Sequence, residues 1–242
     1  DLDQMSRPDE AAFNRIWVVG LEGRRRPGTR GARLVKRHRM GNVEVSLYQQ
    51  PTDPALYDFY EKIHEATVKM VRANGTVAQT CPYDRRRRRH QCRAGWNNVR
   101  QKLAEVDFTL RRCLYAHPVD GETLEIHFPK AQLGTRMVIH TGLDGYDPRL
   151  KARRAVYHWK NPQKRKGKNK GKRDPRGPRE LTDVSLRVLV DGKEVGVVNH
   201  PIDDRWRRNV LDTSTLSGSR SPVVFQISTK WAYSKVFCFY AQ

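Results

Sequence analysis

The chain has 242 residues, of which 37% are hydrophobic, 30% charged and 9% aromatic, a composition that excludes a chain disordered throughout. Its 47 Lys and Arg against 26 Asp and Glu give a formal net charge of +21, which attracts phosphate-rich partners such as nucleic acid, an anionic membrane surface or an acidic polymer. The longest apolar runs are strand-sized, far below the roughly 18 residues that a membrane-spanning helix requires.

The first 80 residues are expected to form a small α/β region. Residues 16–19 form an apolar run closed by Gly20, which predicts a buried strand. Val43, Val45 and Leu47 alternate with polar residues, which predicts a second strand with one face in water.

After these strands, the sequence predicts one helix and one hairpin. Asp53 can accept hydrogen bonds from free backbone amides, and Pro54 suits the first helical position, so the helix is expected to begin there. Its apolar stripe recurs at spacings of three and four residues and ends near residue 66: Leu56, Phe59, Tyr60 and Ile63. Asn74-Gly75 then favours a two-residue hairpin turn.

From residue 81 onward, the chain is typical of an antiparallel β-sandwich. Short apolar segments recur with turns between them: 106–115, 123–128, 137–141, 184–190, 194–199, 205–211, 223–228 and 236–240. Residues 160–180 have no apolar side chain to bury, which indicates an inserted basic loop. The predicted fold class is therefore mainly β: a small α/β region with one helix over residues 1–80, then a jelly-roll-like sandwich over 81–242. The same strand spacing also permits a barrel.

Three basic segments are the strongest chemical signal in the sequence. They are Arg24, Arg25 and Arg26, then Arg85, Arg86, Arg87, Arg88 and Arg89, then residues 164–179 of the inserted loop, beginning with Lys164, Arg165 and Lys166. Guanidinium groups bind phosphate oxygens bidentately, so these residues predict polyanion binding. The alternative is a set of solvated, self-repelling loops without a specific partner. No zinc finger, helix-turn-helix or RNA-binding strand motif accompanies them, which favours backbone affinity over base recognition.

The four cysteines are expected to form two disulfides. Cys81 and Cys92 enclose ten residues that include five arginines, so a bridge between them closes the basic segment into a compact loop. Cys113 and Cys238 both lie in strand-like segments, and we expect them to join neighbouring strands. The alternative for the first pair is a zinc site that also uses His90, although a second close Cys or His pair is absent. Paired cysteines favour an oxidising compartment.

No segment carries a catalytic signature, so we expect no enzymatic activity, no metal and no cofactor. The sequence lacks a nucleophile elbow, a P-loop and a dinucleotide fingerprint, and its histidines lack the spacing of metal-binding pairs. Trp231 and Tyr233 stand among loop-like residues, and with Trp206 they are candidates for stacking on sugar rings at the open end of the sandwich. The alternative is that these aromatic side chains belong to the core.

Several short motifs resemble those of a known family. The segments are Trp96-Asn97-Asn98-Val99, Ala104-Glu105-Val106-Asp107, Arg111-Arg112-Cys113, His117-Pro118, Leu133-Gly134, His140-Thr141-Gly142-Leu143, Val188-Leu189-Val190-Asp191-Gly192, Leu211-Asp212-Thr213-Ser214 and Phe237-Cys238-Phe239. Together they resemble the soluble extracytoplasmic C-terminal region of certain bacterial membrane proteins that look like dolichyl-phosphate-mannose-type glycosyltransferases. The resemblance implies a jelly roll similar to carbohydrate-binding modules, with the transfer chemistry in a membrane region that this chain lacks. The lysine-rich loop and the high charge depart from the family pattern.

The sequence therefore predicts a non-catalytic binding or accessory module on the periplasmic face of a bacterial membrane. Its expected partner is an anionic membrane surface or a phosphate-bearing glycan, with a larger membrane assembly as a further partner. The alternative is a structural nucleic-acid-binding protein of a ribosome-associated or capsid nucleoprotein assembly. The state of the cysteines separates the two, because two bridges favour export whereas four free thiols favour the cytosol.

Overall fold

The described part of the chain is an all-β structure. The computed structural model describes residues 15–21, 33–49, 55–93, 95–106, 109–144, 183–203, 205–230, 232 and 236–242. Across these ranges there are β-strands and two short 3-10 turns but no α-helix, and no helix long and apolar enough to cross a membrane. The predicted mainly β fold class is therefore confirmed. The chain divides into two compact units, one made of residues 1–55 with 108–111 and one made of the remaining residues.

The N-terminal unit contains a three-stranded antiparallel sheet in the order β1-β3-β2. Its strands are β1 (Arg15–Leu21), β2 (Arg33–Met40) and β3 (Val43–Gln49). The turn between β2 and β3 places Gly41 at a φ of +60°, a conformation that glycine adopts without a Cβ penalty. Both predicted strands are present, but the expected burial of the first is wrong, since Trp17 is 62% exposed and Val19 68%.

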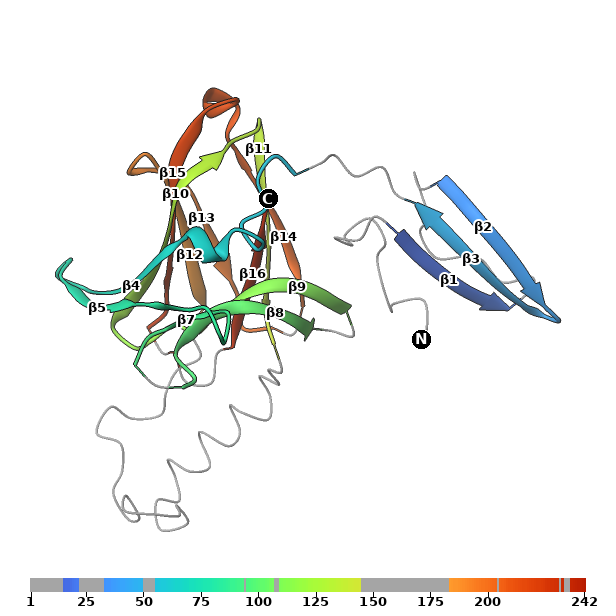
Figure 1. Cartoon of the computed structure of the whole chain (residues 1–242), viewed down its shortest axis with the longest axis horizontal. Helices are drawn as coiled ribbons and strands as arrows, with labels where there is room; N and C mark the ends of the chain where they lie inside the picture. The colour runs from blue at the N-terminus through green and yellow to red at the C-terminus, as the bar shows by residue number, and fades with distance from the viewer. Residues whose placement is uncertain are drawn as a thin grey trace, which may run out of the picture. The chain divides into compact units, whose positions relative to one another are not determined.

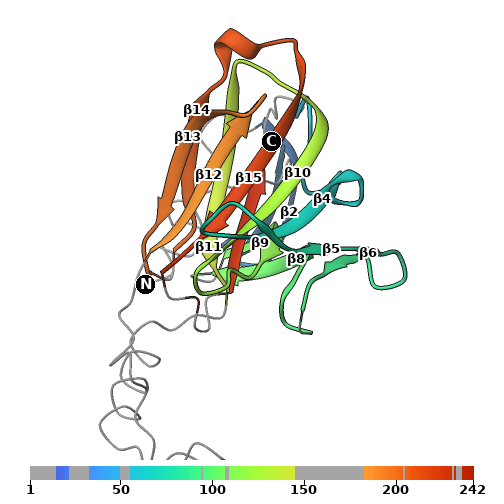
Figure 2. The same ribbon diagram turned by 90° about the vertical axis from the view of Figure 1, so that its left-hand side faces the viewer.

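The larger unit is an antiparallel sandwich of two sheets, as the sequence predicts (Figure 1). The six-stranded sheet has the order β13 (Lys193–His200), β12 (Val184–Val190), β15 (Arg220–Ser228), β10 (Glu122–Gln132), β4 (Thr67–Arg72) and β5 (Val77–Cys81). The seven-stranded sheet has the order β14 (Arg207–Asp212), β11 (Arg136–Leu143), β16 (Phe237–Ala241), β9 (Thr109–Ala116), β8 (Asn98–Val106), β7 (Arg89–Gln91) and β6 (Tyr83–Asp84). Figure 2 shows β13, β12, β15 and β10 side by side in the six-stranded sheet.

The core lies between the two sheets and is filled by alternate residues of the strands. In β15, Val223, Phe225 and Ile227 are fully buried while the residues between them are not, as expected of a strand with one inward face. The ring of Phe225 lies 5.9 Å from that of Phe128 on β10, and the ring of Phe59 lies 4.9 Å from both. Phe59 therefore completes an edge-to-face aromatic cluster from outside the regular strands.

The helix predicted over residues 53–66 is wrong in its described part, from residue 55 onward. That part consists of turns and one 3-10 turn, η3 (Ile63–Glu65). Asp58 Oδ1 accepts a hydrogen bond from the N–H of Tyr60, 2.9 Å away, and an Asx-turn of this kind competes with helical pairing. The N–H of Phe59 instead donates to a carbonyl at the end of β16, 3.3 Å away. Tertiary pairing and core burial thus replace the intrahelical bonds.

The domain boundary also differs from the expected position near residue 80. The predicted hairpin at Asn74-Gly75 forms between β4 and β5, but β4 pairs along its length with β10. The hairpin therefore belongs to the six-stranded sheet, and the sandwich unit begins at Leu56. Met70 of β4 is fully buried in the core, which explains why the sandwich recruits this strand. The basic loop predicted at 160–180 lies outside the described residues.

Both predicted disulfides are present and account for all four cysteines. Cys81 ends β5 and Cys92 follows β7, with Cα atoms 4.5 Å apart, so this bridge joins the two sheets. Cys113 of β9 and Cys238 of β16 join neighbouring strands, with Cα atoms 5.5 Å apart. The sulfur atoms of the first pair are thus not thiolate ligands. The ring nitrogens of His90 lie 3.1 and 2.9 Å from two backbone carbonyl oxygens, so the alternative zinc site is not formed.

Removing the bridge between the sheets, by Cys81→Ser together with Cys92→Ser, is expected to lower the free energy of unfolding by about 3 kcal/mol, because the unfolded chain regains the entropy of an open loop. Urea unfolding of the variant and the wild type measures this difference. As a control, reduction should raise the intact mass of the native protein by that of four hydrogens. Four free thiols in native protein, or a variant with unchanged stability, would contradict the prediction.

Candidate ligand-binding surface

The seven-stranded sheet has two chemically different faces. In β9, Leu114 and Ala116 belong to the sandwich core, so Cys113 and Tyr115 lie on the opposite face, which we name the outer face. Tyr115 and the disulfide of Cys113 form a second, smaller hydrophobic cluster there. The outer face is therefore not a simple solvated surface but has packed apolar residues of its own.

Trp206, one of the predicted sugar-stacking residues, packs on this second cluster. Its ring lies against Gly142 of β11, where an added Cβ would come within 2.8 Å of the indole. Because one side of the half-buried ring is used in packing, we assign Trp206 a structural role. The other two predicted stacking residues, Trp231 and Tyr233, lie outside the described residues.

The predicted basic segment at residues 85–89 is a tight turn between β6 and β7. Its first four arginines are exposed, while Arg89 is half-buried at the start of β7. The turn is held by Asp84 Oδ1, which accepts the backbone N–H of the third arginine at 3.0 Å. The other two predicted basic clusters, residues 24–26 and 164–179, lie outside the described residues.

Arg89 and Arg100 lie directly opposite each other on β7 and β8, and therefore on the same face. Arg89 Nε is buried and has no hydrogen-bond partner among the described residues. The guanidinium of Arg100 lies 5.1 Å from the centroid of the Tyr115 ring, a cation–π contact that places both arginines on the outer face. Like charges directly opposite across two strands repel each other, so an anion bound between them would stabilise this arrangement.

Two acidic groups of this region, Asp84 and Asp144, are already engaged. Asp84, which is opposite Arg89 on β6, is held in the turn by a backbone N–H and a neighbouring guanidinium. Asp144 forms an ion pair with Lys102, whose ammonium lies 5.7 Å from the centroid of the Tyr115 ring. Burial raises the pKa of Tyr115, so its hydroxyl remains a neutral hydrogen-bond donor. Within the described part of the chain, neither arginine of the pair has a carboxylate partner.

Trp96 adds an exposed aromatic ring to this region. It is 53% exposed, and its ring centroid lies 4.8 Å from that of His117. The Tyr115 hydroxyl donates to the Trp96 carbonyl at 3.0 Å, and Asn97 Nδ2 donates to the His117 carbonyl at 3.3 Å. These bonds fix the loop before β8 against the end of β9. We define the Arg–Trp surface by Arg89, Trp96, Arg100, Lys102, Tyr115 and His117.

Sequence reasoning found Arg89 but missed the role of Trp96, Arg100 and Tyr115. In the sequence, Trp96 stands out only as part of a family motif. Arg100 is one of 47 Lys and Arg residues, and no local pattern distinguishes it from the others. The signal that could have found Trp96 is its place in a turn just before a strand. The register between β7 and β8, which brings the two arginines together, is not readable from the sequence.

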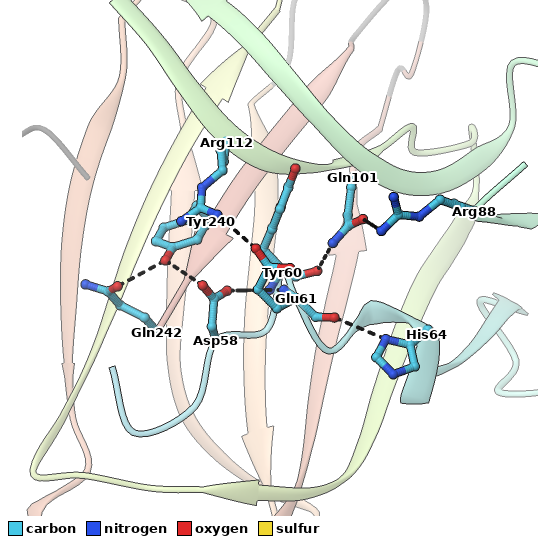
Figure 3. Close-up of polar contacts among 9 residues, drawn as sticks. All are labelled: Asp58, Tyr60, Glu61, His64, Arg88, Gln101, Arg112, Tyr240 and Gln242. Carbon is cyan, nitrogen blue, oxygen red and sulfur yellow. Dashed lines mark hydrogen bonds and ion pairs between the residues drawn. The ribbon is translucent and has the colours of Figure 1, made fainter. Parts of the chain in front are cut away.

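A separate polar network anchors residues 58–64 to the seven-stranded sheet (Figure 3). Tyr240 Oη lies 3.0 Å from Asp58 Oδ2 and 3.1 Å from Gln242 Oε1. Burial, followed by the nearby Asp58 carboxylate, raises the pKa of Tyr240, so its hydroxyl keeps its proton at neutral pH. The phenol can therefore donate to the carboxylate that organises the turn.

Arg112 and Gln101 hold the same segment from β9 and β8 (Figure 3). Arg112 Nη1 donates to Glu61 Oε1 at 2.8 Å, and its guanidinium lies 5.3 Å from the centroid of the Tyr60 ring. Gln101 Nε2 donates to the Tyr60 carbonyl at 2.9 Å, and its Oε1 accepts from Arg88 at 3.4 Å. Because Arg112 has a carboxylate partner, unlike the arginine pair of the Arg–Trp surface, we interpret this network as structural.

Thr141, His200 and Asp203 form a line that resembles a nucleophile, a base and an acid. Thr141 Oγ1 lies 2.9 Å from His200 Nδ1, and His200 Nε2 lies 3.7 Å from Asp203 Oδ1. However, Thr141 and His200 are both fully buried, so the hydroxyl is not accessible to a substrate. Burial lowers the pKa of His200 to about 4, although the Asp203 carboxylate opposes this shift. The neutral imidazole thus links the two sheets through β11 and β13.

Comparisons with known proteins do not identify a family for this chain. No family model matches it, and neither does any curated protein. Among solved structures, the secreted serine protease VesC from Vibrio cholerae matches 94% of this chain and 42% of its own length, at 12% sequence identity and a TM-score of 0.32. A TM-score of this size does not establish a shared fold, so nothing about this chain follows from it. The resemblance to a glycosyltransferase region stays a prediction.

Tyr240→Phe is expected to lower the free energy of unfolding by about 1 kcal/mol, because Asp58 loses its phenolic donor and the anchor of residues 58–64 is weakened. Chemical denaturation measures the change. The matched control is Tyr83→Phe, since the Tyr83 hydroxyl has no hydrogen-bond partner among the described residues and should be dispensable. Equal stabilities of the two variants would contradict the anchoring role.

His200 is expected to make the protein less stable in acid. Its pKa is about 4 in the folded chain against an ordinary value of 6.5, so the unfolded chain binds the proton more tightly. Stability from this group is complete above about pH 6.5 and decreases as the pH falls toward 4. Between about pH 7.5 and pH 5 the loss amounts to roughly 2 kcal/mol. Urea unfolding at both pH values should show this loss, and His200→Gln should reduce it by that amount. An identical pH dependence in the variant would refute the assignment.

Proposed function

We propose that this chain is a non-catalytic binding module that recognises a phosphate-bearing glycan at the Arg–Trp surface. The two disulfides indicate an extracytoplasmic location, because such bridges persist in oxidising compartments. A position on the periplasmic face of a bacterial membrane is part of the proposal, and so is the absence of catalysis. The residues that support the glycan proposal lie on the outer face of the seven-stranded sheet.

The observation that carries the proposal is the pair formed by Arg89 and Arg100 together with the exposed ring of Trp96. Tyr115 connects them, since its ring lies under Arg100 and its hydroxyl donates to the Trp96 carbonyl. A phosphate group between two guanidinium groups neutralises their repulsion and accepts charge-assisted hydrogen bonds from them. The cation–π contact with Tyr115 restricts the plane of the Arg100 guanidinium, which lowers the entropy lost on binding. The face of an exposed indole stacks on the C–H groups of a sugar ring. A phosphorylated sugar could therefore bind the arginine pair through its phosphate and the Trp96 ring through its apolar face.

Nucleic acid remains the rival partner, because the same guanidinium groups bind the phosphates of a polynucleotide. The two partners differ in how salt affects binding. Affinity that depends on counterion release falls steeply with ionic strength, whereas stacking of a sugar on Trp96 does not. Measurements above physiological salt therefore separate the two.

The variant Arg89→Gln with Arg100→Gln tests the proposal by calorimetric titration with mannose 6-phosphate and glucose 1-phosphate. Each lost charge-assisted hydrogen bond is expected to cost about 1.5 kcal/mol or more, so affinity should fall by roughly two orders of magnitude. The matched control, Arg72→Gln with Arg220→Gln, removes the same charge from exposed positions of the six-stranded sheet and should change little. Trp96→Ala should weaken the sugar phosphates about tenfold while leaving inorganic phosphate unaffected.

Three results would overturn this function. An equal loss of affinity in the control variant would mean that net charge, not the site, drives binding. Failure of wild-type protein to bind either sugar phosphate would remove the ligand class. Tight binding of single-stranded RNA or duplex DNA above physiological salt, lost on substitution of residues 85–89, would favour the nucleoprotein alternative.

A further inference from the structure

The three-stranded sheet of the N-terminal unit has two faces that the strand register defines. Residues directly opposite each other in neighbouring strands share a face. Trp17 pairs with Leu47, and Val19 pairs with Val45, so these four side chains lie on one face. The alternate residues of β3 lie on the other face.

On the polar face of this sheet, the side chains of the central strand β3 are buried. Glu44 is 8% exposed and Ser46 is 1% exposed. The Glu44 carboxylate accepts a hydrogen bond from Ser46 Oγ at 3.0 Å and lies 3.4 and 3.2 Å from Nε atoms of Arg37 and Arg39 on β2. The buried charge is thus compensated within the sheet, so this face does not require an external ligand.

The apolar face, in contrast, is exposed and has a basic margin. Its apolar members are Trp17, Val19, Leu21, Met40, Val43, Val45 and Leu47. Trp17 is 62% exposed, Val19 68% and Met40 56%. The register places four basic side chains on the same face, namely Arg15, Arg33, Lys36 and His38. Among the residues of these three strands, no Asp or Glu lies on this face.

We propose that this apolar face docks onto the surface of an anionic lipid bilayer. An exposed apolar patch with a polar margin marks an interaction site, and tryptophan favours the interface between lipid and water. Arg15 and Lys36 at the margin attract anionic headgroups while the central side chains leave water. The absence of acids from the face matches the charge of this partner.

A second copy of the chain fits the face less well than a bilayer does. In a twofold dimer the same patch faces itself, so the basic margins of both copies would approach each other without an acidic group between them. The membrane proposal is independent of the glycan proposal, because it uses none of the residues of the Arg–Trp surface. Failure of one therefore leaves the other standing.

Vesicle sedimentation of the full chain tests the docking. Wild-type protein should bind vesicles of roughly three parts phosphatidylcholine to one part phosphatidylglycerol, and more weakly pure phosphatidylcholine. Trp17→Thr with Val19→Thr keeps residues that suit a strand and should reduce this binding by about tenfold or more. The control Val77→Thr with Val197→Thr, at exposed positions of the sandwich, should leave it unchanged. Part of the binding should survive at roughly 0.5 M NaCl, because apolar contact is not screened.

Fluorescence supplies a second measurement that does not depend on the double variant folding. Brominated phosphatidylcholine in the same vesicles should quench part of the tryptophan emission of wild-type protein. Trp17→Phe should abolish that quenching while vesicle binding is retained. Unchanged quenching in this variant, undiminished binding of the Trp17→Thr/Val19→Thr variant, or no binding of wild-type protein would each overturn the proposal. A dimer in light scattering that the threonine variant dissociates would overturn it too, by assigning the face to a second copy.

Discussion

The inward anchoring of His90 is the constraint on which the outer surface of the sandwich depends. The residue is 2% exposed, and its ring lies within hydrogen-bond distance of carbonyl oxygens on β5 and on η3. Because neighbouring residues of a strand point to opposite faces, a buried His90 forces Arg89 outward, where the ladder sets it against Arg100. The Cys81–Cys92 bridge closes the same corner and joins the two sheets. The burial of His90 thus both fills this corner of the core and sets Arg89 opposite Arg100.

Ion pairing decides which of the many basic side chains could bind an anion. Arg112 faces Glu61 at 2.8 Å and Arg93 faces Glu122 at 2.7 Å, so these cations are locally neutralised. Such half-exposed pairs contribute little to stability, but they decide which guanidinium groups remain available for a ligand. The arginine pair of the Arg–Trp surface has no carboxylate partner among the described residues, and the Tyr115 ring packs against Arg100. The proposed anion site is therefore confined to one place, although the charge is spread along the chain.

The failures of sequence reasoning share one physical cause, which is that tertiary contacts decide between local alternatives. The spacing of Phe59 and Ile63 suits a helix, yet both side chains reach the core from turns and η3 because Asp58 and the end of β16 satisfy the backbone differently. The alternation in β3 predicted a strand correctly. It did not show that Glu44 would be buried, since the side-chain period marks two faces without saying which one is covered.

The sequence by itself determined the β-rich class, the sandwich, the Asn74-Gly75 hairpin and both disulfides, because alternation, turn chemistry and an even cysteine count are local or additive signals. Only the tertiary structure decided the extent of the sandwich and the composition of its candidate site. Arg89 and Arg100 lie eleven positions apart in the chain, and their contact depends on strand register, which is set by the packing of the buried face. A side chain becomes available to a ligand when its neighbours in space leave it unpaired, and those neighbours are chosen by the fold.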